Sequence, residues 1–96
     1  YDNLWNRISG KDIYLSFDVD VFDSSLMPAT GTPQPGGLFW DEIIAILQKG
    51  SQVANIVGAD ICELAPINDN SACDFLAAKL AYKILAFSLY GNGLPA

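Results

Sequence analysis

The stretch that decides the fold is residues 13–38, which read IYLSFDVDVFDSSLMPATGTPQPGGL. Its first five residues are mostly apolar and β-prone, and they meet Asp18 abruptly, which is typical of the end of a strand buried on both faces. Residues 21–37 then carry three prolines and three glycines, a density that excludes regular structure. Loops of this length inside compact domains are usually functional or disordered. We therefore expect a buried strand that leads into a long loop with a function.

Signals for helix and strand continue to alternate downstream. Residues 40–49 space apolar side chains at helical period and carry acidic residues in the first turn, with Gly50 as the predicted end. Residues 53–59 form a second apolar run that again meets an aspartate. A last helix is predicted at residues 71–90, and a short helix end at residues 1–8. The expected apolar face of the last helix consists of Phe75, Leu76, Leu80, Ile84 and Phe87.

The order strand, helix, strand, helix predicts an α/β fold with parallel strands and a right-handed crossover. In such sheets, ligands bind beyond the carboxyl ends of the strands. Five of the eleven acidic residues lie in the two windows that follow the predicted strands. They are Asp18, Asp20, Asp23, Asp60 and Glu63. We therefore expect one edge of the sheet to be strongly negative.

Length and charge bound the classes of function. The chain has 96 residues, with 5 Lys and Arg against 11 Asp and Glu, no His and a formal net charge of -6, which leaves room for one small domain. This acidity disfavours nucleic acid as a partner, because affinity for phosphate backbones comes from cations. The most apolar run, residues 76–89, carries Lys79 and Lys83, so no uncharged run of ~18 residues could span a bilayer. We expect no nucleic-acid and no membrane partner.

The cysteine content bears on the cellular location of the protein, and the apolar fraction bears on whether the chain is a whole domain. Cys62 and Cys73 have no second thiol nearby in sequence, which favours a reducing compartment. We interpret both as small buried hydrophobes and, since no signal peptide is visible, expect a cytoplasmic location. An apolar share of 51% is high for a free-standing domain of this size. The chain therefore resembles a piece of a larger core.

The pair Asp18 and Asp20 is the first candidate site. At a strand end alternate residues point the same way, so the two carboxylates should converge while Val19 packs into the core. Their repulsion must be offset by a cation, a raised pKa or solvation. Without histidine, and with the cationic residues elsewhere in the sequence, a hard divalent ion such as Mg²⁺ or Mn²⁺ is one solution. A solvated pair that caps local amides is the other, and the pair alone does not separate them.

Residues 16–38 resemble the last signature of the ureohydrolase family, which contains arginases, agmatinases and formimidoylglutamases. The matching elements are the S-F-D-x-D strand end, Pro28-Ala29, the run Thr30-Gly31-Thr32-Pro33 and the Gly36-Gly37-Leu38 exit. Residues 58–66, GADICELAP, are similar to the family's second acidic strand end. Ser24 departs from the pattern, because the family usually has proline there. The resemblance covers roughly residues 11–89.

The resemblance implies a three-layer α/β/α fold with a parallel sheet, of which this chain is the C-terminal strand–helix–strand–helix part. It implies a two-manganese site in which Asp18 bridges both ions and Asp20 binds one. It also implies that Glu63 pairs with a substrate guanidinium and that Thr32 lines the pocket, as Thr30 could. The implied reaction is attack of a metal-activated hydroxide on the guanidinium carbon, with release of urea. Asp60 is expected to be structural or to act behind the ligands.

Missing motifs limit what this chain could do by itself. The family completes its metal pair with His and Asp residues from two motifs earlier in the chain, and this sequence has no histidine. We therefore predict that residues 1–96 are the C-terminal fragment of a single ureohydrolase domain and contain none of its proton-shuttling catalytic residues. The fragment alone should bind manganese weakly and release no urea. The resemblance implies a homo-oligomer, a trimer or hexamer, as the assembled form.

The substrate is open among the family's members. A small cationic guanidino compound is expected, with agmatine, converted to the polyamine putrescine and urea, ahead of arginine and formimidoylglutamate. The stretch Leu64-Ala65-Pro66 favours agmatine slightly, because arginases more often have Asn before the proline. A magnesium-dependent phosphoryl or glycosyl transferase is disfavoured, since no cation or preceding glycine loop is present to hold phosphates. From a different class, an acidic divalent-cation-binding module without catalysis remains an alternative.

Overall fold

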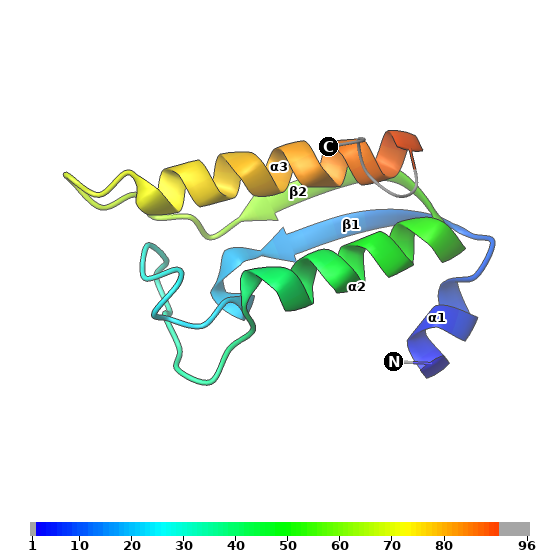
Figure 1. Cartoon of the computed structure of the whole chain (residues 1–96), viewed down its shortest axis with the longest axis horizontal. Coiled ribbons are helices and arrows are strands. Elements are labelled where there is room, and N and C mark those ends of the chain that lie inside the picture. The colour runs from blue at the N-terminus through cyan, green and yellow to red at the C-terminus, as the bar shows by residue number, and fades with distance from the viewer. Residues whose placement is uncertain (1, 91–96) are drawn as a thin grey trace.

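The computed structural model describes residues 2–90, and the predicted helix residue Tyr1 lies outside this range. Two parallel strands alternate with helices, as Figure 1 shows. The elements are the helix α1 (Asp2–Ile8), the strand β1 (Asp12–Asp18), a 3-10 turn (Val19–Val21), the helix α2 (Trp40–Val53), the strand β2 (Asn55–Cys62) and the helix α3 (Ala72–Tyr90). The predicted α/β class with parallel strands is confirmed.

The register of the two strands contains one irregularity near its start. Ile13 pairs with Ile56, but Tyr14 pairs with Gly58, so Val57 is an extra residue on β2. From there the pairing continues without interruption until Asp18 lies opposite Cys62. A bulge of this kind changes which side chains share a face. The bulge therefore places the last residues of both strands side by side.

Two predicted boundaries are wrong. The second strand does not span residues 53–59 but runs from Asn55 to Cys62, because pairing with β1 extends through Cys62. Asp60 consequently lies within the strand and not beyond it. The helix α2 does not stop at Gly50, whose carbonyl accepts a hydrogen bond from the amide of Ala54 at 3.0 Å. A glycine within a helix costs only about 1 kcal/mol relative to alanine, so the helical hydrogen bonds continue through it.

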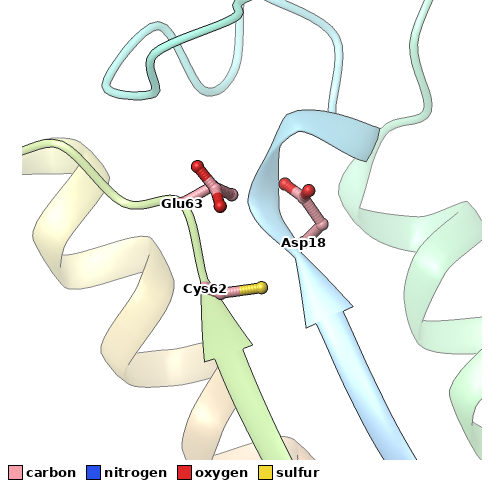
Figure 2. Close-up of side chains that lie close together, drawn as sticks. All are labelled: Asp18, Cys62 and Glu63. Atoms are coloured by element: carbon pink, nitrogen blue, oxygen red, sulfur yellow. The ribbon is translucent and has the colours of Figure 1, made fainter.

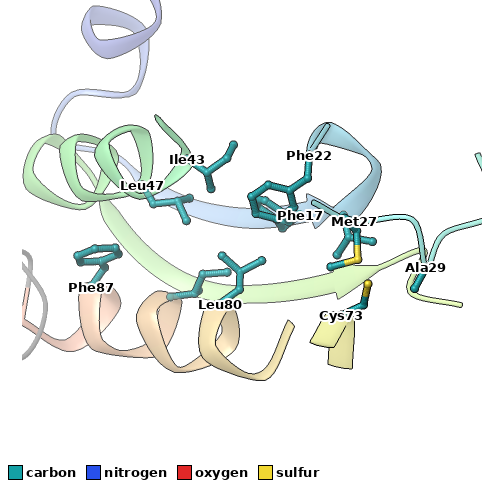
Figure 3. Close-up of a cluster of buried hydrophobic side chains, with 11 residues drawn as sticks. Phe17, Phe22, Met27, Ala29, Ile43, Leu47, Cys73, Leu80 and Phe87 are labelled. Carbon is teal, nitrogen blue, oxygen red and sulfur yellow. The ribbon is translucent and has the colours of Figure 1, made fainter. Parts of the chain in front are cut away.

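The core lies on one face of the sheet. The helices α2 and α3 contact each other and pack on the same side, so their apolar side chains meet those of β1 in a single cluster (Figure 3). Its buried members are Phe17, Val19, Phe22, Met27, Ala29, Ile43, Leu47, Cys73, Leu80, Ile84 and Phe87. The first strand was predicted to be buried on both faces, and this prediction is wrong for residues 2–90. Phe17 faces the core, whereas Tyr14, on the opposite face of the strand, is 62% exposed. Both helices cover the side that carries Phe17.

The apolar face of α3 differs in part from the predicted one. Phe75 was expected to be buried and is 73% exposed. The buried positions begin instead at Cys73 and Ala77 and continue at intervals of three or four residues through Leu80, Ile84 and Phe87, which is the spacing of one helix face. Cys73 is buried, as predicted. Within residues 2–90, no helix combines the length and apolar character that crossing a membrane requires.

The loops that matter for function gather at one end of the molecule. Both strands point toward the same end in Figure 1, and the segments that follow them, residues 19–39 and 63–71, lie there together. A backbone hydrogen bond of 2.7 Å from the amide of Ala65 to the carbonyl of Ala29 joins the two segments. This is the carboxyl edge of the sheet, where α/β proteins bind their ligands.

Candidate functional site

Three potential ligand groups meet where the two strands end (Figure 2). Asp18 is the last residue of β1, Cys62 is the last residue of β2, and Glu63 follows it. One ligand atom from each lies within 4.8 Å of the others. Asp18 and Glu63 are exposed and Cys62 is half-buried. The structure thus brings together two predicted site residues, Asp18 and Glu63, that are 45 positions apart in the sequence.

The backbone of Glu63 has an uncommon conformation. Its φ angle is 71°, in the left-handed region that residues other than glycine occupy only rarely. The next residues are held in place from the other loop, because Leu64 forms a bridge with Thr30 and the amide of Ala65 donates to Ala29. Such a conformation persists when the surrounding structure fixes it. The turn at Glu63 ends β2 and leaves its carboxylate beside Asp18.

The two aspartates of the D-x-D pair are arranged differently from the prediction. Extended backbone stops at Asp18, because the chain enters a 3-10 turn at Val19, and the alternation expected for Asp18 and Asp20 is therefore wrong. Val19 is fully buried, as predicted. The Oδ1 atom of Asp18 accepts a hydrogen bond from the amide of Asp20 at 3.0 Å. Asp18 therefore caps the turn that carries Asp20 through its Oδ1 atom. The Oδ2 atom of Asp18 takes no part in this cap.

Asp20 is held by a residue from the long loop. Its Oδ2 atom accepts a hydrogen bond from the hydroxyl of Thr32 at 2.9 Å, and its side chain is half-buried. Asp20 is not a member of the group formed by Asp18, Cys62 and Glu63. Thr32 is exposed, whereas Thr30 is buried and its Oγ1 has no hydrogen-bond partner within the described residues. The two threonines of the loop are thus separated by the structure, and only Thr32 contacts a predicted ligand.

Cys62 is a member of the group at the strand ends that the sequence does not predict. The prediction that it is a buried hydrophobe is wrong, because the side chain is half-exposed and its Sγ lies 3.5 Å from the carbonyl oxygen of Phe17, to which it donates. Desolvation and then the negative charges of Asp18, Asp60 and Glu63 raise the pKa of this thiol. The sequence signal for Cys62 is its position directly before Glu63. A second strand that ends at Ala59, as predicted, does not reach Cys62, so the pairing of Cys62 with Asp18 does not follow from that prediction.

Asp60 makes contacts within the sheet. Its two carboxylate oxygens accept hydrogen bonds of 2.9 Å each from the hydroxyls of Tyr14 and Ser16 on β1. The hydrogen bond to Asp60 is also the main cause of the raised pKa of Tyr14. These contacts join the exposed face of β1 to β2. They fit the expectation that Asp60 is structural or acts behind the ligands.

The donor set at the strand ends suits a hard divalent cation. The carboxylates of Asp18, Asp20 and Glu63 supply oxygen atoms, which such ions prefer, and residues 18–39 and 60–71 contain no lysine or arginine to offset their negative charge. The pKa of the Cys62 thiol is raised mainly by desolvation and, second, by the negative field of Asp18, Asp60 and Glu63. A bound cation would offset this field. The oxygen donors of Asp18, Asp20 and Glu63 are thus of the kind that a site for a divalent cation such as Mn²⁺ contains. A metal cluster with histidine ligands would need residues that this chain does not contain.

The parallel strands, the helices that cover them and the acidic residues at the carboxyl edge identify an α/β protein with its site at the strand ends. A sequence model of the Arginase family matches residues 1–86. The chain belongs to the arginase family.

Individual relatives agree with this assignment. The chain is 39% identical over 80 residues to N(1)-aminopropylagmatine ureohydrolase of Synechocystis sp., a match that covers 83% of the chain and 26% of the relative. Among solved structures, it superposes on a putative agmatinase from Clostridium difficile with a TM-score of 0.73 at 41% identity, over 83% of the chain and 30% of that protein. It also superposes on proclavaminate amidino hydrolase from Streptomyces clavuligerus with a TM-score of 0.80 at 32% identity, over 95% of the chain and 30% of that protein.

The extent of these matches bounds what they establish. The chain spans about a quarter of the length of the curated ureohydrolase it matches. This chain contains the two parallel strands, their helices and the acidic loops. The fold class of this chain is therefore established, whereas the activity of the full-length protein is not fixed by a match over about a quarter of the relative's length.

Proposed function

We propose that this chain is the C-terminal part of a ureohydrolase that hydrolyses the guanidino group of a small cationic substrate, with agmatine converted to putrescine and urea. One observation carries the proposal: the carboxylates of Asp18 and Glu63 meet at adjacent strand ends. One of them comes from the segment that resembles the metal-binding signature, and the other from the segment that resembles the substrate-binding one. Membership of the arginase family supports the reaction class.

Asp18 and Asp20 are the residues that would hold manganese. Asp18 offers a carboxylate at the very end of β1, and the hydrogen bond from Thr32 fixes the orientation of Asp20. When bound, a pair of manganese ions would supply a hydroxide nucleophile near neutral pH. The role of this chain is to keep two anionic side chains in place without a cationic neighbour from the same loops. Asp18 does so by capping the turn that carries Asp20.

Glu63 is the residue that would bind the substrate. A guanidinium is planar and cationic, and a carboxylate can accept two parallel hydrogen bonds from it. Glu63 is exposed, and its carboxylate lies beside Asp18. Binding there would bring the guanidinium carbon next to the proposed metal ligands. Thr32 would line the same pocket while it holds Asp20.

The names of the relatives suggest the substrates to test first. Proteins similar to this chain are named agmatinase and N(1)-aminopropylagmatine ureohydrolase, so an N-substituted agmatine is a second candidate on the strength of 39% identity. Arginine and formimidoylglutamate are the other family substrates. We further propose a cytoplasmic enzyme that assembles as a homo-oligomer, a trimer or hexamer, and has neither nucleic acid nor membrane as a partner.

The test is urea release by the full-length protein that contains this chain. The protein would be stripped with chelator, reloaded with Mn²⁺, and assayed with agmatine, aminopropylagmatine, arginine and formimidoylglutamate. We expect urea from agmatine or aminopropylagmatine, dependent on Mn²⁺ and lost in Asp18→Asn. Binding of Mn²⁺ or Ca²⁺ without urea from any of the four would instead favour a noncatalytic cation-binding module. The 96-residue chain by itself should release no urea, and clear activity of the isolated chain would contradict the proposal.

A further inference from the structure

One carboxylate closes the long loop at both ends. The Oδ2 atom of Asp23 accepts hydrogen bonds from the amide of Ser25, at 2.9 Å, and from its hydroxyl. The Oδ1 atom accepts from the amides of Gly36, at 2.8 Å, and Gly37, at 3.2 Å. Ser25 stands at the start of the loop and the glycines stand at its end. The side chain of Asp23 therefore bridges the two ends of residues 24–37 with four hydrogen bonds.

The backbone around Asp23 is also closed. Its amide donates to the carbonyl of Leu38 at 2.8 Å, and the amide of Ser24 donates to the carbonyl of Gln34 at 3.0 Å. A Cβ atom on Gly37 would lie 2.5 Å from the backbone nitrogen of Asp23, so the two backbone segments approach as closely as only glycine permits. The entry and exit of the loop are thus one unit that is centred on Asp23.

The same loop contacts the carboxylate of Asp20 and the backbone that follows Glu63. Thr32 within it donates a hydrogen bond to Asp20. Ala29 accepts a hydrogen bond from Ala65, and Thr30 forms a bridge with Leu64, the residue that follows Glu63. Hydrogen bonds from this one loop thus reach both Asp20 and the residues that follow Glu63. The position of the loop therefore affects the proposed metal ligand and the proposed substrate-binding residue together.

We propose that Asp23 is a positioning residue, which fixes Asp20 through Thr32 and fixes the turn at Glu63 through Ala29 without contacting metal or substrate itself. The inference rests on the proposed function. Aspartate in a turn often only caps local amides. Here the four donors come from both ends of a loop, and the middle of that loop contacts Asp20 and the residues after Glu63. Groups that orient metal ligands from behind typically change metal affinity about 10- to 100-fold when removed.

The decisive substitution is Asp23→Asn in the full-length protein. Asparagine has nearly the same shape but only one carbonyl oxygen, so one end of the loop loses its acceptor and meets an NH₂ group. We expect the Kd for Mn²⁺, measured by titration calorimetry or by the EPR signal of free Mn²⁺, to rise about tenfold. We expect kcat/KM for urea release to fall by a similar factor. The matched control is Asp69→Asn, an exposed loop aspartate at a φ of 62°, which asparagine tolerates well.

A double-mutant cycle separates positioning from a general loss of stability. If Asp23 acts through Thr32, the effects of Asp23→Asn and Thr32→Val on the Kd for Mn²⁺ should not add, since both release Asp20. Thr32→Ser, which keeps the hydroxyl, should restore most of the affinity that Thr32→Val loses. A purely structural role would lower the melting temperature of Asp23→Asn and leave its Kd for Mn²⁺ unchanged. That outcome, or fully additive effects, would overturn the inference.

Failure of the inference is distinguishable from failure of the proposed function. A wild-type protein that neither binds Mn²⁺ nor releases urea would remove the function on which the inference rests, and with it the inference. An active wild type with Asp23→Asn indistinguishable from Asp69→Asn would overturn the inference alone. Should Asp23→Asn fail to fold, Ser25→Ala removes one of the four donors and serves instead. A weaker Mn²⁺ affinity in Ser25→Ala would support the inference, and an unchanged affinity would contradict it.

Discussion

The two strand ends of the sheet carry similar acids but are organised by different means. The end of β1 is followed by a loop that is held by its own side chains, with Asp18 capping Asp20, Thr32 donating to Asp20 and Asp23 closing the loop. The end of β2 is followed by a left-handed residue, Glu63, and by backbone contacts with the first loop. The side of the site with the proposed metal ligands is therefore held by contacts within its own segment, and the side with the proposed substrate-binding residue depends on that segment.

This difference has a consequence for function. A disturbance of the first loop should affect both sides of the site, because Ala29 and Thr30 contact the residues after Glu63. A substitution of Glu63 should have only a local effect. Within residues 2–90, the side-chain hydrogen bonds of the first loop do not involve Glu63. Substitutions on the two sides of the site should therefore differ in how far their effects extend.

Substitution of Asp18 by Asn should have the largest effect. Asparagine removes the charge that would bind the cation while it keeps the acceptor for the amide of Asp20. We expect metal content to be lost and urea release to fall by at least about a hundredfold, more than the loss of a residue that only orients a ligand. Metal analysis after desalting and a urea assay on the full-length protein measure both. Metal content equal to wild type would contradict the assignment of Asp18 as a ligand.

Substitution of Glu63 by Gln should affect substrate binding alone. The charge-assisted pair with a guanidinium is replaced by weaker neutral hydrogen bonds, so kcat/KM should fall roughly tenfold to a hundredfold while the Kd for Mn²⁺ stays within about twofold of wild type. Steady-state kinetics and a Mn²⁺ titration check this split. A large loss of Mn²⁺ affinity would show instead that Glu63 is a metal ligand and that the two sides of the site are not separate.

Alanine at two glycines compares the rigidity of the two regions. At Gly37 the added Cβ would lie 2.5 Å from the backbone of Asp23, whereas at Gly58 it would lie 2.9 Å from the ring of the exposed Tyr14. Because backbone cannot move aside easily, we expect Gly37→Ala to lower the free energy of unfolding by about 1–3 kcal/mol and Gly58→Ala by roughly 1 kcal/mol or less. Denaturant unfolding gives both values.

Gly31→Ala is the control for this pair, because nothing lies within 4 Å of the Cβ position there. Among these three variants, only Gly37→Ala should also weaken Mn²⁺ binding, because Gly37 is the one of the three glycines that donates to Asp23 where the loop closes. Equal losses of stability in the Gly37 and Gly58 variants would contradict the contrast between a fixed loop and an adaptable side chain.

The smallest effect concerns pH. Hydrogen bonds from the hydroxyl and amide of Ser25, and then from the amides of Gly36 and Gly37, lower the pKa of Asp23 from its ordinary value of 3.8. A carboxyl with a lowered pKa contributes stability above its ordinary pKa, and this contribution is lost as the pH falls through the pKa of the folded state. The gap in unfolding free energy between wild type and Asp23→Asn should therefore be constant near neutral pH and narrow below about pH 3.8. A gap that widened in acid would contradict the hydrogen-bond assignment.

Much of the fold could be predicted from the sequence, for identifiable reasons. The abrupt change from Phe17 to Asp18 marked a strand end, and prolines and glycines marked the long loop that follows it. Both features are local and need no knowledge of the partner strand. The end of β2 was predicted three residues too early, because the bulge at Val57 and the pairing of Asp18 with Cys62 depend on contacts between residues that are distant in sequence.

Candidate site residues could be named from the sequence, but their arrangement in space could not be predicted from it. Asp18, Asp20 and Glu63 follow the predicted strands as acidic residues, and the family resemblance adds Thr32. The structure places all four at the carboxyl edge of the sheet. The 3-10 turn after Asp18 and the exposure of Cys62 were not predictable, since each depends on packing against another segment. The bridging role of Asp23 was also hidden, because its donors at Gly36 and Gly37 lie 13 and 14 residues away.

The central claim is that the carboxylates at the end of β1 hold divalent metal while Glu63 remains available to a guanidinium. Anomalous diffraction at the manganese absorption edge, from crystals of the full-length protein soaked in Mn²⁺, tests it directly. We expect anomalous peaks within coordination distance of Asp18 and Asp20 and none at the carboxylate of Glu63. Absence of any peak at Asp18, or a peak coordinated by Cys62 and Glu63 without Asp20, would contradict it.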